Sequence, residues 1–251
     1  MIDIHTHVLY GVDDGAKTLE ESLAMIRMAG ASGTTDLVAT PHANLKYKFD
    51  PQKIRARLEE ISGEGVRVYS GCDFHLSYEN IQDAIANPAR YTINQKCYLL
   101  VEFSDLIIFK NTPEIFARLQ DAGMVPIVTH PERNGLLRQR IGEIAKWVES
   151  GARVQLTAQS LLGRFGPRAR EFSEMLIDRG LAHFIASDAH DCQHRPPKLE
   201  EAFAWIEKRY GRELADLLCV TNPRAAINGA PVNSMEMFAR GETRKWYQIW
   251  R

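Results

Sequence analysis

Seven short apolar runs recur along the chain, separated by longer segments in which apolar residues return at helical spacing. Each run is three to five residues long and rich in Ile, Val, Leu or an aromatic residue, which is typical of buried strands. The runs occupy residues 2–4, 37–39, 66–70, 98–101, 127–129, 154–156 and 184–186. We therefore predict seven strands in this order.

Helix signals lie between these strands. Thr18 begins the sequence T-L-E-E, a capping box with Glu21, and Asp50-Pro51 is an N-cap followed by a residue favoured at the first helical position. Similar patterns predict helices over residues 112–122, 141–150, 167–179, 199–210 and 213–218. The alternation predicts an α/β fold of parallel β/α units, in a closed or nearly closed barrel, with an open doubly wound sheet as the alternative.

Composition narrows the class of protein. The chain has 251 residues, of which 45% are hydrophobic and 25% charged, and a net charge of -1, which gives no basic field for nucleic acid. No apolar stretch is long enough to span a membrane, and no signal-peptide pattern is visible. The four cysteines form no C-x-x-C pair, which favours reduced thiols and a cytoplasmic location.

No linker or repeat divides the chain, so we predict one domain over residues 1–251. Residues 229–251 form a C-terminal extension, which we expect to dock on the barrel or to make a homo-oligomer contact.

Metal-binding residue types follow six of the seven predicted strands. They are His5, His7, Asp14, His42, Asp73, Glu102, His130, Asp188 and His190. Because parallel strands end at one rim, where β/α barrels carry their active sites, we expect these side chains to meet. Imidazoles and carboxylates bind zinc, iron or manganese. Nine ligands exceed the needs of one ion, so the sequence predicts two or three divalent ions that share a bridging carboxylate.

Clustered metal ions suit phosphate ester hydrolysis, and two arginines are placed to assist. Arg133 and Arg195 are candidates for bidentate contacts to phosphate oxygens. Asp3 and Asp13 are expected to accept hydrogen bonds from ligating histidines or to shape turns. His75, His183 and His194 do not fit the pattern and are predicted to be structural or surface residues. The cysteine-phosphatase loop, dinucleotide-binding and P-loop motifs are absent from the sequence.

Several segments together resemble a known family. DIHTH, DDGAKTLEES, ATPH, VEFS, THPER, IASDAH and RPP, in this order between residues 1 and about 228, resemble the PHP superfamily. More narrowly, they are similar to bacterial metal-dependent protein-tyrosine phosphatases encoded with capsule and exopolysaccharide genes. This resemblance implies a distorted, TIM-like (β/α)7 barrel and three metal ions, usually manganese, with iron or zinc as alternatives.

The resemblance also implies residue roles. One ion would bind His5, His7, Asp73 and Asp188, a second would share Asp73 and add Glu102 and His130, and a third would bind Asp14, His42 and His190. Arg133, Arg195 and Asp188 are the implied catalytic residues. The implied substrate is phosphotyrosine in the C-terminal tail of a membrane tyrosine kinase that controls polysaccharide export.

One position departs from the family, and other functions stay open. The third-strand ligand is Glu in the family and Asp73 here, so its carboxylate reaches less far. A small-molecule phosphatase, such as histidinol phosphatase, shares the metal ligands and is the alternative enzyme. A non-catalytic binding module is a third hypothesis. The loop ANLKYKF and residues 164–170 are candidates for lining a rim that accepts peptides.

Overall fold

The computed structural model describes residues 1–63 and 65–233. Within them, the bounds of the strands are β1 (Ile2–Thr6), β2 (Asp36–Ala39), β3 (His42–Ala43), β4 (Arg67–Ser70), β5 (Asp73–His75), β6 (Tyr98–Glu102), β7 (Val125–Thr129), β8 (Arg153–Thr157) and β9 (Phe184–Ala186). All seven predicted strands form, as β1, β2, β4, β6, β7, β8 and β9. After a break, the second and third each continue as a short strand that was not predicted, β3 and β5 respectively.

The two breaks have local causes. Pro41 interrupts the ladder between β2 and β3 because proline has no N–H to donate. Gly71 separates β4 from β5 at a close approach, where a Cβ atom would lie 2.7 Å from Cγ1 of Val38. Each break turns the following two or three residues toward the rim, and His42 and Asp73 then pair in parallel register.

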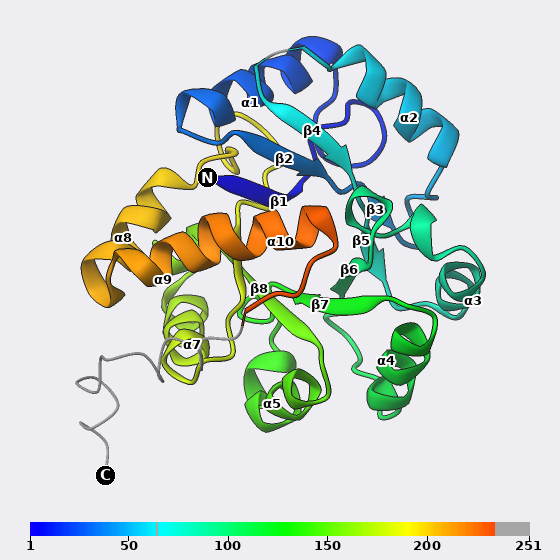
Figure 1. Cartoon of the computed structure of the whole chain (residues 1–251), viewed down its shortest axis with the longest axis vertical. Coiled ribbons are helices and arrows are strands. Elements are labelled where there is room, and N and C mark those ends of the chain that lie inside the picture. The colour runs from blue at the N-terminus through cyan, green and yellow to red at the C-terminus, as the bar shows by residue number, and fades with distance from the viewer. Residues whose placement is uncertain (64, 234–251) are drawn as a thin grey trace.

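All ladders are parallel, and they form two sheets of order β1-β2-β4 and β3-β5-β6-β7-β8-β9. A bridge between Thr6 and Ala189 joins the sheets, and the N–H of His7 donates to the carbonyl of Ala189 at 2.8 Å. The strands therefore form the predicted distorted barrel, with helices around its outside (Figure 1). The distortion lies at β4, whose ladder partner is β2 alone among the described strands.

The helices include all those predicted and three others, α3, α6 and α10. Their bounds are α1 (Leu19–Ala31), α2 (Pro51–Glu60), α3 (Tyr78–Ala86), α4 (Thr112–Asp121), α5 (Ile141–Glu149), α6 (Ala158–Leu161), α7 (Pro167–Asp178), α8 (Glu200–Tyr210), α9 (Arg212–Asp216) and α10 (Asn222–Asn228). Short 3₁₀ turns lie at Pro88–Arg90, Ile93–Gln95 and Leu137–Gln139, and a π-helical turn, Leu217–Thr221, links α9 to α10.

The predicted capping box of α1 forms only in part. The Thr18 hydroxyl accepts a hydrogen bond from the N–H of Glu21 at 3.3 Å, as the motif requires. The Glu21 carboxylate, however, accepts from the N–H of Lys17 at 2.7 Å, one residue before the cap.

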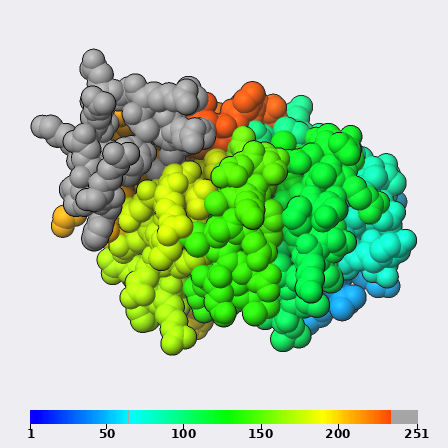
Figure 2. Space-filling model, turned by 90° about the horizontal axis from the view of Figure 1, so that it is seen from below, coloured from blue at the N-terminus to red at the C-terminus, as the bar shows by residue number. Residues whose placement is uncertain are grey.

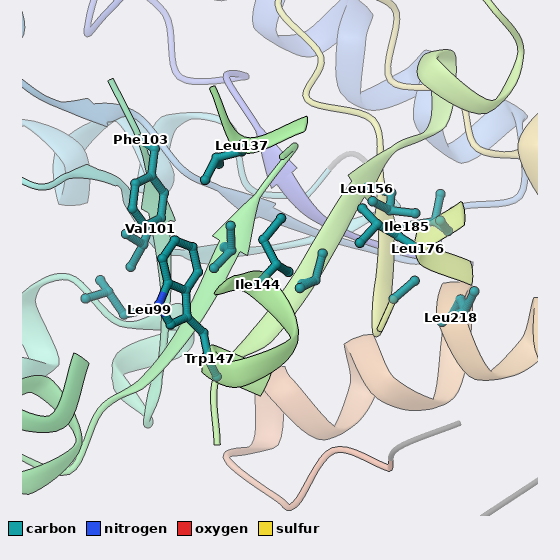
Figure 3. Packing of buried hydrophobic residues seen from close by; sticks show 14 of the residues in the cluster. Leu99, Val101, Phe103, Leu137, Ile144, Trp147, Leu156, Leu176, Ile185 and Leu218 are labelled. Carbon is teal, nitrogen blue, oxygen red and sulfur yellow. The ribbon is translucent and has the colours of Figure 1, made fainter. Parts of the chain in front are cut away.

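The outer core binds the helices to the barrel and supports the rim (Figure 3). Phe103, the first residue after β6, stacks on Trp147 of α5, with ring centroids 5.3 Å apart and planes 5° apart. Leu99, Val101 and Ile144 belong to the same buried cluster. The loop that follows Glu102 is therefore packed at its base. In the space-filling view of Figure 2, the parts of the chain coloured yellow-green and green lie side by side on the face seen from below.

The opposite end of the barrel is covered by α10, which crosses it in Figure 1. Ala226 and Ile227 pack against Ile2, Ile4 and Phe184 in a second buried cluster. Asn222, at the start of α10, is buried and donates to the carbonyl of His183 at 3.0 Å. The end at which the strands begin, which we call the closed end, is thus packed mainly with apolar side chains, and the end at which they finish carries the nine predicted ligand residues.

Two sequence predictions concern other parts of the chain. No helix among residues 1–63 and 65–233 combines the length and apolar character needed to cross a membrane. Of the predicted extension at residues 229–251, residues 234–251 lie outside the described residues, so its packing stays a prediction.

Candidate metal centre

The nine predicted ligand residues meet at the carboxyl end of the barrel. Potential ligand atoms come within 4.8 Å of one another in four overlapping groups, which are His7/Asp14/His42/His190, His5/His7/Asp188, His5/Asp73/His130 and His42/Asp73/Glu102. Among the described residues, these groups contain all nine predicted side chains and no others. The barrel thus gathers residues from six strand ends into one continuous centre.

His5 in β1 and His7, the first residue after it, turn the same ring nitrogen into the centre. Nδ1 of His5 lies 2.9 Å from Oε1 of Gln155, and Nδ1 of His7 lies 2.7 Å from Oδ2 of Asp13. These oxygens accept, so each Nδ1 carries a proton and Nε2 is the nitrogen that faces the centre. The two Nε2 atoms are 3.4 Å apart. A cation bound between them would take the place of a proton on these nitrogens.

Asp73 gives the clearest test of whether a metal ion fits. Its side chain is fully buried, and neither carboxylate oxygen has a hydrogen-bond partner of adequate geometry. Oδ2 faces Nδ1 of His42 at 3.0 Å and Nε2 of His5 at 3.6 Å. A buried carboxylate without donors is costly unless a positive charge compensates it, so divalent cations fit this donor set.

Neighbouring carboxylates show the same need for positive charge. Burial, and next the charge of Asp73, raise the pKa of Glu102 to about 8. Hydrogen bonds from His190 and His42 hold the pKa of Asp14 well below its usual range. The two ring nitrogens concerned lie 3.5 and 3.4 Å from Oδ1 of Asp14.

Asp188 links the histidines to the two predicted arginines. Its Oδ1 lies 3.4 Å from Nε2 of His5, while its Oδ2 accepts from the guanidinium groups of both Arg133 and Arg195. Burial would raise the pKa of Asp188, but His5 and then the arginines hold it well below its usual range. The predicted catalytic trio therefore lies together, with both arginines at the edge of the centre.

The backbone is strained at two of these residues. His130 comes directly after β7 and Asp188 two residues after β9, and their φ angles are 33° and 51°, in the left-handed region. Residues other than glycine seldom adopt this conformation, and such strain is concentrated at functional sites. The turn aims each side chain into the barrel mouth instead of continuing the strand.

The family profile described as "Capsular polysaccharide synthesis, CpsB/CapC" matches residues 1–228. The chain belongs to the CpsB/CapC family. CapC of Staphylococcus aureus is 35% identical, over 99% of this chain and 100% of CapC. The tyrosine-protein phosphatase YwqE of Bacillus subtilis (strain 168) is 34% identical, over 87% of this chain and 88% of YwqE.

The fold of this chain also matches a solved structure. The matched chain comes from the crystal structures of YwqE from Bacillus subtilis and CpsB from Streptococcus pneumoniae, described as unique metal-dependent tyrosine phosphatases. It matches with a TM-score of 0.87 and 32% identity, over 93% of this chain and 97% of the solved chain. The predicted resemblance and the barrel fold are thereby confirmed.

This CpsB/CapC chain also uses buried polar residues that the sequence analysis missed. Glu132, fully buried, accepts from the N–H of Thr157 at 2.9 Å and from the hydroxyl of Ser160 at 2.8 Å. Asn134 donates to the carbonyl of Ser104 at 3.0 Å. These bonds tie the segment on both sides of Arg133 to β8, α6 and the loop after β6. The signal in the sequence was the run P-E-R-N, polar yet directly after a buried strand.

The predicted rim loops differ from each other in the CpsB/CapC chain. In the loop after β3, Asn44 Oδ1 accepts from the N–H groups of Lys46 and Tyr47, both at 2.9 Å. This turn holds Tyr47 parallel to His42, with ring centroids 6.0 Å apart. In residues 164–170, Phe165 lies under the guanidinium of Arg133 at 4.4 Å, whereas Arg164 and Arg170 form ion pairs with Glu201 and Glu174.

Proposed function

We propose that this chain is a metal-dependent protein-tyrosine phosphatase. The observation that carries the proposal is the carboxylate of Asp73, which is fully buried among histidines and carboxylates and forms no hydrogen bond of adequate geometry. That arrangement is explained by divalent cations, and the matched YwqE and CpsB structures are described as metal-dependent tyrosine phosphatases. The reaction is hydrolysis of a phosphoric monoester on the phenol oxygen of tyrosine.

For the ions, we propose the ligand sets that the family resemblance implies. They are His5/His7/Asp73/Asp188, Asp73/Glu102/His130 and Asp14/His42/His190, and each set combines residues that approach one another in the centre. The mixture of imidazole and carboxylate ligands supports manganese, with iron or zinc as competitors. Divalent cations bound there supply charge against phosphate oxygens and lower the pKa of water, so that hydrolysis proceeds near neutral pH.

The protein's own residues bind and orient the phosphate. Arg133 and Arg195 offer paired N–H groups to its oxygens, in the bidentate geometry that guanidinium favours. Asp188 holds both guanidinium groups at one point, and Glu132 and Asn134 fix the backbone around Arg133. Gln155 and Asp13 keep the Nε2 atoms of His5 and His7 facing the centre. The arginines therefore stabilise charge on the phosphate without having to reorganise.

The proposal extends to partner and location. We infer that the substrate is the phosphotyrosine tail of a membrane tyrosine kinase that controls capsule or exopolysaccharide synthesis, as the family resemblance implies. A cytoplasmic location is supported by the four cysteines, all of which are free thiols. The homo-oligomer stays a prediction.

A comparison of substrates tests the function. We expect protein purified with Mn²⁺ to hydrolyse a phosphotyrosine peptide with a kcat/KM well above that for the matched phosphoserine peptide. The phosphate on tyrosine stands at the end of a rigid ring and reaches a recessed centre more easily. Histidinol phosphate is the third substrate. A higher kcat/KM for histidinol phosphate would replace the proposal with the small-molecule phosphatase.

A further inference from the structure

Large apolar side chains are exposed in one part of the surface next to the candidate metal centre. Six such side chains stand out among the described residues, and five of them follow three strand ends. These five, which we call the apolar rim, are Leu45, Tyr78, Leu106, Ile107 and Phe109. Leu45 and Leu106 are 90% and 91% exposed. Single exposed apolar residues are ordinary, but a group on adjacent loops marks an interaction surface.

The apolar rim is continuous with the candidate metal centre. Its residues follow β3, β5 and β6, which are hydrogen-bonded neighbours in one sheet and carry His42, Asp73 and Glu102. Leu45 comes three residues after His42, and Leu106 four residues after Glu102. Since a residue spans at most about 3.3 Å, their Cα atoms lie within about 10 and 13 Å of those ligand residues.

The loops of the apolar rim are anchored, so their exposed side chains are held outward. Leu76 and Ile108 are buried in the same core cluster, against which Phe49 also packs. Asn80 donates to the carbonyl groups of Ala43 and His75, at 2.7 and 2.9 Å, and so joins two of the loops. Leu106 N–H donates to the hydroxyl of Ser104 at 3.1 Å. Exposure of Leu45 and Leu106 is therefore a property of ordered loops.

We propose that the apolar rim binds the residues that flank the phosphotyrosine in a protein substrate. This inference rests on the proposed function and names the preferred sequence. An extended chain advances about 3.3 Å per residue, so side chains two to four residues from the phosphotyrosine reach about 7–13 Å, the range of Leu45 and Leu106. The preferred flanking residues are aliphatic or aromatic.

Charges near the apolar rim favour a peptide over a membrane surface. The loop of residues 43–49 carries Lys46 and Lys48 and no acidic residue, which favours acidic residues on that side of the substrate. The rim residues after β5 and β6 are flanked in sequence by two acidic residues, Glu79 at the start of α3 and Asp105, and by one basic residue, Lys110, so these segments offer no net positive charge to the anionic headgroups of a bilayer. A peptide can place apolar, acidic and neutral residues individually along this surface.

The test changes residues of the apolar rim in the protein and the flanking residues in the peptide substrate. The variant Leu45→Ser/Leu106→Ser is compared with Met175→Ser, a matched control, since Met175 is the exposed apolar side chain outside the rim, on α7. The substrates are a phosphotyrosine peptide with leucines at positions -3 and +3, the same peptide with serines there, and 4-nitrophenyl phosphate. Each peptide's kcat/KM is divided by that for 4-nitrophenyl phosphate.

We expect the double variant to lower this ratio about tenfold for the leucine peptide, through KM. A tenfold loss is about 1.4 kcal/mol, within what partial burial of two leucines supplies. The ratio for the serine peptide should stay within about twofold, and Met175→Ser should change neither. Equal losses for both peptides, or no loss, would overturn the docking surface.

Two further measurements separate other uses of the surface. If the wild type sediments with phosphatidylglycerol vesicles and the double variant does not, while the peptide ratios stay unchanged, the apolar rim binds membranes and the proposal is overturned. If the double variant has a lower mass than the wild type in light scattering, while the peptide ratios stay unchanged, the apolar rim binds a second copy of the chain. That result would also overturn the proposal. If wild-type protein hydrolyses 4-nitrophenyl phosphate but neither peptide, the proposal that the apolar rim docks a substrate is wrong, and the phosphatase chemistry is not. If it hydrolyses none of the three, the proposed function itself is wrong.

Discussion

Two buried aspartates at opposite ends of the barrel are each held by two arginines, yet their surroundings differ. Asp36, the first residue of β2, accepts from Arg67 at 2.7 Å and from Arg224 at 3.0 Å. Asp188, just after β9, accepts from Arg133 and Arg195. Both aspartates are at most 2% exposed. Burial and pairing alone therefore do not separate a structural carboxylate from one in an active site.

The difference lies in what else the carboxylates meet. Asp36 also accepts from the hydroxyl of Thr35 at 2.7 Å, and the cluster joins β2, β4 and α10. Asp188 instead turns its second oxygen toward His5 and His7, beside Asp73, whose carboxylate has no hydrogen bond of adequate geometry. The carboxylate of Asp36 is fully paired by neighbouring side chains. The carboxylates around Asp188 and Asp73 are only partly paired, and their donor atoms fit divalent cations. Incomplete pairing is the feature that marks function here.

Of the changes that separate the two ends of the barrel, metal removal should have the largest effect on activity. We expect dialysis against a chelator to reduce phosphotyrosine phosphatase activity to background and Mn²⁺ to restore it, because the centre loses its charge compensation. Elemental analysis of active protein should show more than one metal ion per chain. Full activity with one ion or fewer per chain would contradict the multinuclear assignment.

Substitution of one aspartate at each end should separate function from stability. Asp73→Ala should lose bound metal and at least about 10³-fold in kcat, since an interaction confined to the site is removed. Asp36→Ala should keep its metal and kcat but lose about 2 kcal/mol of unfolding free energy, because several buried hydrogen bonds break. Urea denaturation and elemental analysis measure both quantities.

Asp73→Glu restores the residue that the family carries and sharpens the test. It should keep most of the metal, because the carboxylate is preserved and lengthened by one methylene. Unchanged metal content in Asp73→Ala would remove this residue from the centre.

The sequence predicted the active end of the molecule better than the closed end. His5, Asp73 and Asp188 were recognisable because each lies within three residues of the end of a predicted strand, and the ends of parallel strands meet at one rim. The Asp36 cluster was not, because Arg224 lies far along the chain in α10, a helix of seven residues with weak periodicity. Gln155 and Glu132 were missed because their roles depend on contacts between strands. The breaks at Pro41 and Gly71 were missed because each half-strand is too short to show a pattern.

Removal of one arginine at each end should reproduce the contrast at a smaller scale. Arg133→Ala and Arg195→Ala should each lower kcat about 10²–10³-fold and leave metal content unchanged, since one oriented donor to the phosphate is lost. Arg67→Ala should leave kcat unchanged and reduce the free energy of unfolding by less than Asp36→Ala does, because the Arg67 side chain is 64% exposed. If Arg67→Ala lowered kcat as much as Arg133→Ala, the two ends would not be functionally distinct.

The smallest expected effect is the pH dependence of the closed end. Burial alone would raise the pKa of Asp36, but its hydrogen bonds with Arg67, Thr35 and Arg224 lower it from 3.8 to about 2. A carboxyl whose pKa is lower in the folded state stabilises the fold above its unfolded pKa and loses that contribution as the pH falls toward its folded pKa. The stability difference between the wild type and Asp36→Asn should therefore be constant above about pH 5 and shrink between about pH 4 and pH 2. Urea denaturation of both proteins in chelator, which keeps the metal centre from contributing, measures this difference. A difference that persists unchanged to pH 2 would mean that the charge of Asp36 does not stabilise the closed end.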